Sequence, residues 1–278
     1  MVSGSDGAVW VLEANSDHTE KIARFTSAGV THEWSSPALY EIGSTVTLGP
    51  DGALWFTGYG HGQGATIGRI TTSGHITMYP VKSVGVALEI STGPDGALWF
   101  AIEGGGVGRI TMSGAITTYC PGCFGHTAQS IVGGPDGAIW ITVYGQIRRI
   151  TTSGGVDPKV ATPRSVSPTM MTSGPDGAFW FTELGPNIGR LTTSEMVTEY
   201  PIPVEPEVAG ERYPIWIAAG PDGALWFTET THTVGQMTTA GGVNEYPISR
   251  HPFAIAGGPD RAVWFAEEGN RIGRLSAD

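Results

Sequence analysis

The chain has 278 residues, a formal net charge of −11 and only 15% charged side chains. It lacks the surplus of lysine and arginine needed to neutralise phosphates, so we expect no nucleic-acid partner. No run of 18 apolar residues occurs, and the first residues do not have the pattern of a signal peptide. We therefore expect no membrane span, and a soluble protein that is cytoplasmic or secreted with its signal removed.

A turn of the form Gly-Pro-Asp-Gly, followed by a short apolar run with a tryptophan, returns seven times along the chain. The tryptophans are Trp10, Trp55, Trp99, Trp140, Trp180, Trp226 and Trp264, which are 38 to 46 residues apart. This period is typical of four-stranded propeller blades. The sequence predicts an all-β, seven-bladed β-propeller of four-stranded antiparallel blades, forming one domain over residues 1–278.

The fifth repeat shows the predicted strands most clearly. We expect strands over 170–172, 179–182, 188–192 and 197–200, with the turn Gly174-Pro175-Asp176-Gly177 joining the first two. Glycine takes positive φ without steric cost and aspartate bonds its own backbone, so this turn suits a tight hairpin. The arginines that follow the third-strand Ile-Gly pair, such as Arg190, are expected to tie neighbouring blades together.

The last repeat has predicted strands over 253–256, 263–266 and 272–275 but no fourth strand before Asp278. Only Met1 to Ser3 precede the first turn, so the first repeat is also short. We expect either a trimmed N-terminus, incomplete ring closure, or an edge covered by another subunit. The protein is expected to be a monomer, or a dimer formed through this open blade edge.

Three phrases carry a resemblance to a known family over all seven repeats: 220–229 (GPDGALWFTE), 67–74 (IGRITTSG) and 199–203 (EYPIP). They resemble the streptogramin B lyase family, also called virginiamycin B lyase. The resemblance implies a seven-bladed propeller that opens a cyclic depsipeptide at its ester bond by elimination. It further implies a magnesium ion, a histidine base and metal-binding glutamates near the centre of one face.

The family's two histidines follow proline at the start of the first strand of the last two blades. Ile215 and Phe253 stand at these positions here, so the base and its partner are replaced. Glu268 matches a family glutamate, beside Glu267, and His251 stands where the family has another glutamate. The resemblance, so modified, predicts a rearranged site with His251 and Glu268 as catalytic residues.

The predicted topology places the linkers between blades and the loops after each second strand on one face. We expect a small molecule to bind there, at the mouth of the central channel. The predicted ligand-binding residues are Tyr213, Trp216, His61 and His232. Imidazole and carboxylate groups in one pocket are suited to acid–base work. Converging carboxylates would suit Mg²⁺ or Ca²⁺, for which the predicted ligands are Glu103, Glu267 and Glu268.

Two further features have more than one interpretation. The pair Cys120 and Cys123 is compatible with a small-loop disulfide or free thiols, with a zinc site that includes His126, or with redox chemistry. Glu183 and Glu229 belong to the repeated phrase and are interpreted as ordinary edge residues of the blades. Neither feature selects a function.

Three classes of function remain open. The first is an enzyme related to the lyase family, acting on a cyclic ester, lactone or related molecule by metal-assisted proton abstraction and elimination. The second is a propeller that binds a ligand or protein without chemistry, which the two replaced histidines favour. The third is a lactone hydrolase, which the seven repeats disfavour. The first agrees best with the sequence.

Overall fold

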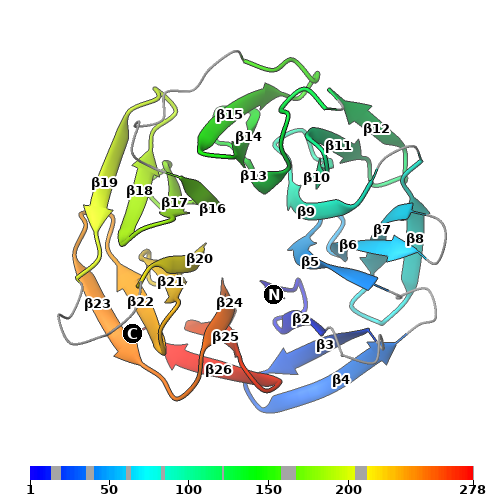
Figure 1. Ribbon diagram of the computed structural model, residues 1–278. Coiled ribbons are helices and arrows are strands. Elements are labelled where there is room, and N and C mark those ends of the chain that lie inside the picture. The colour runs from blue at the N-terminus through cyan, green and yellow to red at the C-terminus, as the bar shows by residue number, and fades with distance from the viewer. Residues whose placement is uncertain are drawn as a thin grey trace.

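The computed structural model describes residues 1–13, 20–35, 41–60, 64–82, 85–120, 122–157, 167–203 and 212–277. In this part of the chain, seven antiparallel sheets are arranged as blades around a central channel, as Figure 1 shows. The predicted all-β, seven-bladed propeller is confirmed. No helix in the described residues is long and apolar enough to cross a membrane.

Each blade runs from an inner to an outer strand in chain order. Blade one contains β1 (Val2–Ser3), β2 (Val9–Glu13), β3 (Lys21–Thr26) and β4 (Gly29–Ser35). Blade two contains β5 (Glu41–Leu48), β6 (Leu54–Gly60), β7 (Gly64–Ile70) and β8 (Ile76–Pro80). Blade three contains β9 (Ala87–Thr92), β10 (Leu98–Ile102), β11 (Gly106–Ile110) and β12 (Ile116–Tyr119).

Blade four contains β13 (Ala128–Gly133), β14 (Ala138–Val143) and β15 (Gln146–Thr151). Blade five contains β16 (Pro168–Ser173), β17 (Phe179–Glu183), β18 (Asn187–Leu191) and β19 (Val197–Pro201). Blade six contains β20 (Pro214–Ala219), β21 (Leu225–Glu229), β22 (Thr233–Met237) and β23 (Val243–Pro247). Blade seven contains β24 (Pro252–Gly257), β25 (Ala262–Glu267) and β26 (Arg271–Ser276). In the described residues, blade four has only a bridge between Ile150 and Val156 in place of a fourth strand.

The repeated aspartate explains why the same phrase recurs in each blade. In blade five, Asp176 Oδ1 accepts a hydrogen bond from Trp180 Nε1 at 3.0 Å, and Asp176 Oδ2 accepts one from Arg190 Nε at 2.7 Å. Although burial alone would raise it, these bonds hold the pKa of Asp176 below its ordinary value. The prediction that the arginines tie neighbouring blades is wrong, because each pairs with the hairpin aspartate of its own blade. In blade six, Gln236 replaces the arginine and donates to Asp222 at 2.7 Å.

A close approach between second and third strands explains the recurring glycine before the arginine. A Cβ atom added to Gly189 would lie 2.1 Å from the ring of Phe181, which is fully buried. A side chain at this position would therefore displace the ring that fills the space between neighbouring blades. The second strands β10, β14, β17 and β21 are buried along their whole length and form the centre of their interfaces.

Blades one and seven close the ring by side-chain packing. Trp264 of blade seven lies in one apolar cluster with Val9, Val11 and Phe25 of blade one. Ser3 Oγ also donates to the carbonyl of Gly257 at 2.6 Å. The expected shortness of blade one is confirmed, since β1 has two residues, and blade seven has three strands in the described residues. In the part of the chain that the structure describes, the two blades are in contact without sharing a strand.

Candidate functional site

The linkers between blades and the loops after the second strands lie on one face, as the topology predicts. Four repeated backbone hydrogen bonds, 2.9 to 3.1 Å long, join them. In each, the amide of a loop residue donates to the carbonyl of a linker residue. The pairs are Glu103 to Val86, Leu184 to Ser167, Thr230 to Tyr213 and Glu268 to His251. We call this side of the ring the linker face.

The structure brings His251 and Glu268 together on the linker face of blade seven. Glu268 N donates to His251 O at 2.9 Å, which fixes the linker against the loop that follows β25. The His251 ring lies 5.0 Å from the Phe253 ring, and its Nδ1 is buried without a hydrogen-bond partner. Nε2 is therefore the nitrogen through which this imidazole would exchange a proton with a ligand. The contact between His251 and Glu268 is made by backbone atoms.

A cavity of about 230 Å³ lies beside this pair, between blades seven and one. Phe253, Glu267 and Glu268 line it from blade seven, and Glu13 and Leu12 line it from blade one. Phe253 is 47% exposed, so an aromatic face is offered to a ligand. Burial, together with the charge of Glu33, raises the pKa of Glu13, which the ammonium of Lys21 partly offsets. The cavity thus combines apolar surface with several carboxyl groups.

The remaining predicted ligand-binding residues are spread over the linker face and the channel. Trp216, on the inner strand β20, lines two cavities of the central channel, of about 130 and 270 Å³, together with Glu89 and Met170. Tyr213 is half-buried in the linker before β20, and His232 is exposed in the loop after β21. His61 lies outside the described residues. The structure does not gather these residues around His251.

The predicted metal ligands do not form one group. Glu103 is exposed on blade three, whereas Glu267 and Glu268 are on blade seven. Among the described residues, no three His, Cys, Asp or Glu side chains are placed to hold one metal ion. Ca²⁺ takes six to eight oxygen ligands, and the described side chains supply no such cluster. Mg²⁺ keeps several waters and needs only one or two carboxylates, which Glu267 and Glu268 would offer.

Blade six contains a buried charge network that the sequence did not indicate. Two nitrogens of the Arg212 guanidinium group, Nε and Nη2, donate hydrogen bonds to the carboxylate of Glu229. This glutamate is fully buried at the end of β21. Arg212 Nη2 also lies 2.7 Å from Glu245 Oε1 on β23. Glu229 is therefore no ordinary edge residue, because its charge is compensated inside the blade.

Glu183 occupies the same position in blade five, where it pairs across the sheet with Pro168 as Glu229 pairs with Pro214. It is only 2% exposed, and its Oε1 has no hydrogen-bond partner. Burial, and to a lesser degree the charge of Glu199, raises the pKa of Glu183 to about 7. The interpretation of Glu183 as an edge residue is also wrong, since its side chain is enclosed.

The raised pKa of Glu183 predicts a pH-dependent loss of stability. The folded state binds the proton of Glu183 more tightly than the unfolded chain does. The contribution of this group to the free energy of unfolding is therefore fully present below about pH 4.5 and is lost as the pH rises through about 7. We expect Glu183→Gln to be more stable than the parent at pH 8 by about 1–3 kcal/mol and similar at pH 4.5. Urea unfolding at both pH values measures this. Equal effects at both pH values would contradict the assignment, and Glu195→Gln on an exposed turn is the control.

Glu89 is the titratable residue of the channel wall that sequence reasoning missed. It lies on the inner strand β9, and its Oε2 accepts a hydrogen bond from Ile131 N at 2.6 Å. Burial raises the pKa of Glu89 to about 8, although bonds from Ser130 and Ile131 oppose this. The sequence did contain a signal for Glu89. It is a carboxylic acid on a first strand between the apolar residues Leu88 and Ile90.

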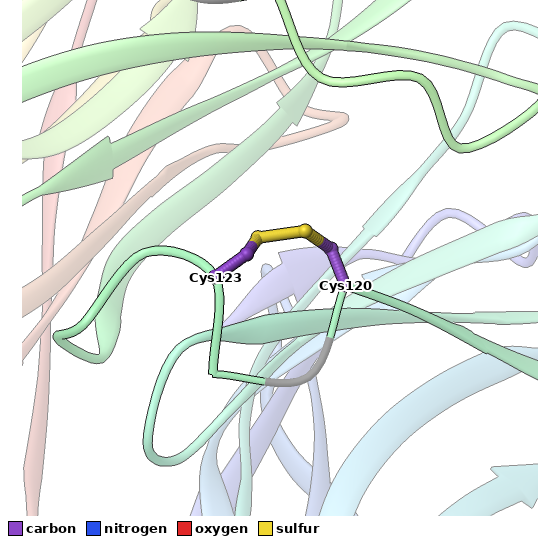
Figure 2. Close-up of a disulfide and its surroundings, with 2 residues drawn as sticks. All are labelled: Cys120 and Cys123. Carbon is purple, nitrogen blue, oxygen red and sulfur yellow. A yellow bond between two sulfur atoms is a disulfide. The ribbon is translucent and has the colours of Figure 1, made fainter.

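Cys120 and Cys123 form a disulfide, shown in Figure 2. Of the alternatives left open by the sequence, the structure therefore shows the small-loop disulfide and not free thiols or a zinc site. His126 instead stacks on Tyr144, with ring centroids 4.3 Å apart. This loop lies on blades three and four, away from the His251 pair.

Comparison with known protein families identifies the group to which this propeller belongs. The model of the virginiamycin B lyase family matches residues 1–121 and 90–278, so the repeats are matched along the whole chain. The chain belongs to the virginiamycin B lyase family. A comparison with curated protein sequences found no significant match.

Solved structures of virginiamycin B lyases have the same fold over nearly the same length. A streptogramin B lyase structure has 30% identity and a TM-score of 0.82, covering 98% of this chain and 91% of the other. The virginiamycin B lyase of Staphylococcus aureus has 32% identity and a TM-score of 0.81, covering 99% and 92%. A catalytically inactive histidine-to-alanine variant of the S. aureus enzyme with quinupristin has 32% identity and a TM-score of 0.78, covering 98% and 96%.

A more distant solved structure shares the fold alone. The extracellular domain of a putative hybrid two-component system from B. thetaiotaomicron has 15% identity and a TM-score of 0.76, covering 99% of this chain and 40% of the other. At the two positions where the resemblance implies histidine, this chain has Ile215 and Phe253.

Proposed function

We propose that this virginiamycin B lyase family member binds a cyclic ester, lactone or related molecule at the cavity between blades seven and one and opens it by elimination. The observation that carries the proposal is the local arrangement of blade seven. His251 is bonded through its carbonyl to Glu268 N, and Glu268 lines the cavity together with Phe253 and Glu267. The His251 ring lies 5.0 Å from that of Phe253, which brings an imidazole next to the carboxylates and the apolar platform of this cavity.

The chemistry assigned to these residues is proton transfer. His251 Nε2 takes a proton from the carbon next to a carbonyl group of the bound ring. The electron pair of that C–H bond forms a carbon–carbon double bond, and the neighbouring C–O bond of the ester breaks. The ester leaves as a carboxylate, and no water is consumed. Phe253 orients the apolar part of the ring, while Glu267 accepts hydrogen bonds from its amide groups.

Binding without turnover is the second candidate. Ile215 and Phe253 are apolar where the resemblance implies two histidines, and this replacement favours a surface that recognises a ring without reacting with it. A family member of this kind would sequester the ligand.

A panel of cyclic depsipeptides and lactones, incubated with the protein and followed by chromatography, separates the two candidates. We expect ring opening of at least one streptogramin B-type depsipeptide. The assay contains Mg²⁺, and a parallel sample with EDTA tests the cation that the family resemblance implies. Saturable binding with no product from any ring would contradict the enzyme and support the second candidate.

A further inference from the structure

One position of the inner strands supplies side chains to the wall of the central channel. In blades two to seven it lies five residues before the proline of the hairpin turn. Figure 1 shows these inner strands around the channel. The residues at this position are Thr45, Glu89, Ser130, Met170, Trp216 and Ala254. All except the fully buried Ser130 line a cavity of the channel, so this position determines what the channel can hold.

Glu89 makes a contact between blades for which a hydroxyl group is sufficient. Thr45 Oγ1 and Ser130 Oγ each accept a hydrogen bond, 3.0 and 3.1 Å long, from a backbone amide of the next blade. Glu89 Oε2 accepts the equivalent bond from Ile131 N at 2.6 Å. The fold therefore requires an acceptor at this position but not a charge. The ionisable group of Glu89 is more than this contact needs.

The cavity beside Glu89 combines one ionisable group with an apolar wall. It has a volume of about 270 Å³, and its apolar lining residues are Leu88, Ala128, Met170 and Trp216. Of the described residues that line it, Glu89 alone has a side chain that can carry a charge. Burial disfavours the carboxylate and raises the pKa of Glu89 to about 8. A cation in the cavity would compensate this charge, and the face of an indole ring also attracts cations.

We propose that this cavity binds a small organic cation, whose ammonium group pairs with Glu89 and whose apolar part packs on Trp216 and Met170. An alkylammonium ion is favoured over a metal ion, because it buries apolar surface against the wall and needs few oxygen acceptors. The cavity has the volume of about nine water molecules in the liquid, which is enough for an amine with a six-carbon chain. This site does not depend on the proposed elimination chemistry.

Titration calorimetry of the full chain with hexylamine tests the proposal. At about pH 8.5 the amine is protonated and Glu89 is largely ionised. We expect saturable binding of one hexylammonium ion per chain. We expect 1-hexanol to bind at least about tenfold more weakly, because the alcohol has no charge to pair with the carboxylate. No saturation up to about 10 mM hexylamine would overturn the proposal, and so would equal affinities for the amine and the alcohol.

Two replacements of Glu89 separate ligand binding from stability. Glu89→Gln and Glu89→Thr remove the charge but keep an acceptor for Ile131 N, as Thr45 does for the equivalent amide. Both variants are expected to bind hexylammonium at least about tenfold more weakly, and urea unfolding checks that they are folded. Glu195→Gln, on an exposed turn, is the matched control and is expected to keep the parent affinity. Parent affinity in the Glu89 variants would overturn the proposal.

NMR of the methionine methyl groups locates the ligand. Met170 lines the cavity, whereas Met196 is 68% exposed on a turn of the same blade. With each signal assigned by a Met→Leu variant, we expect hexylamine to shift the ε-methyl signal of Met170 and not that of Met196. Trp216→Ala removes part of the apolar wall and is expected to weaken binding about tenfold. An unchanged Met170 signal at saturation would overturn the assignment of the ligand to the channel.

Discussion

Replacing His251 with alanine is expected to reduce turnover of a ring substrate by about 10²- to 10⁴-fold while the fold is retained, because a positioned general base contributes a factor of this size. We choose His251 because its ring lies 5.0 Å from that of Phe253, which lines the cavity between blades seven and one. The backbone bond from Glu268 to His251 does not depend on the side chain, so the linker is expected to stay in place.

The matched control for His251→Ala is His75→Ala. His75 is an exposed histidine in the turn between β7 and β8, far from the linker face. Initial rates over a range of substrate concentrations, measured for both variants, separate binding from chemistry. We expect kcat to fall for His251→Ala alone. A His251 variant with the parent rate would remove this residue from the mechanism, and a change in KM without a change in kcat would assign it to binding.

Replacing Trp180 with alanine is expected to lower the free energy of unfolding by about 3–5 kcal/mol, a large share of the stability of an ordinary domain. Trp180 is fully buried between blades five and six, where it packs with Ile217 and Phe227. It also donates to Asp176 and stacks on Tyr200, with ring centroids 5.3 Å apart. The variant loses packing, a hydrogen bond and a ring stack together.

Denaturation in urea measures the effect of Trp180→Ala. Tyr144→Ala is the control, since Tyr144 is 73% exposed and its loss is expected to change stability by no more than about 0.5 kcal/mol. A loss below about 1 kcal/mol for Trp180→Ala would contradict the assignment of this tryptophan to the blade interface.

The fold could be predicted from the sequence because its determinants are local and repeated. The hairpin aspartate bonds the tryptophan four residues later and an arginine of the third strand, all within one blade. In blade five the predicted strands agree with the observed ones to within two residues at every end. Seven copies of one phrase also predicted the number of blades directly, and the seven sheets of the structure agree with it.

The candidate site was predicted only in part, because the sequence of a single repeat does not determine its contacts with linkers and with other repeats. The proximity of His251 and Glu268 followed from topology, whereas the burial of Glu183 and Glu229 did not. Both glutamates end the repeated sequence Trp-Phe-Thr-Glu, which is typical of the exposed end of a strand. Glu229 is enclosed by Arg212, which belongs to the linker and not to the repeated sequence. Glu89 was missed for a similar reason, since its partner Ile131 belongs to the next blade.

The most direct test of the proposed chemistry is opening of a streptogramin B depsipeptide in heavy-oxygen water, followed by mass spectrometry. Elimination breaks the C–O bond without consuming water, so the account predicts a ring-opened product of unchanged mass that contains no heavy oxygen. Incorporation of one heavy oxygen atom would show hydrolysis, as expected of a lactone hydrolase. It would contradict elimination. If this depsipeptide and the rest of the panel bind but remain closed, the account of blade seven as a catalytic site is wrong.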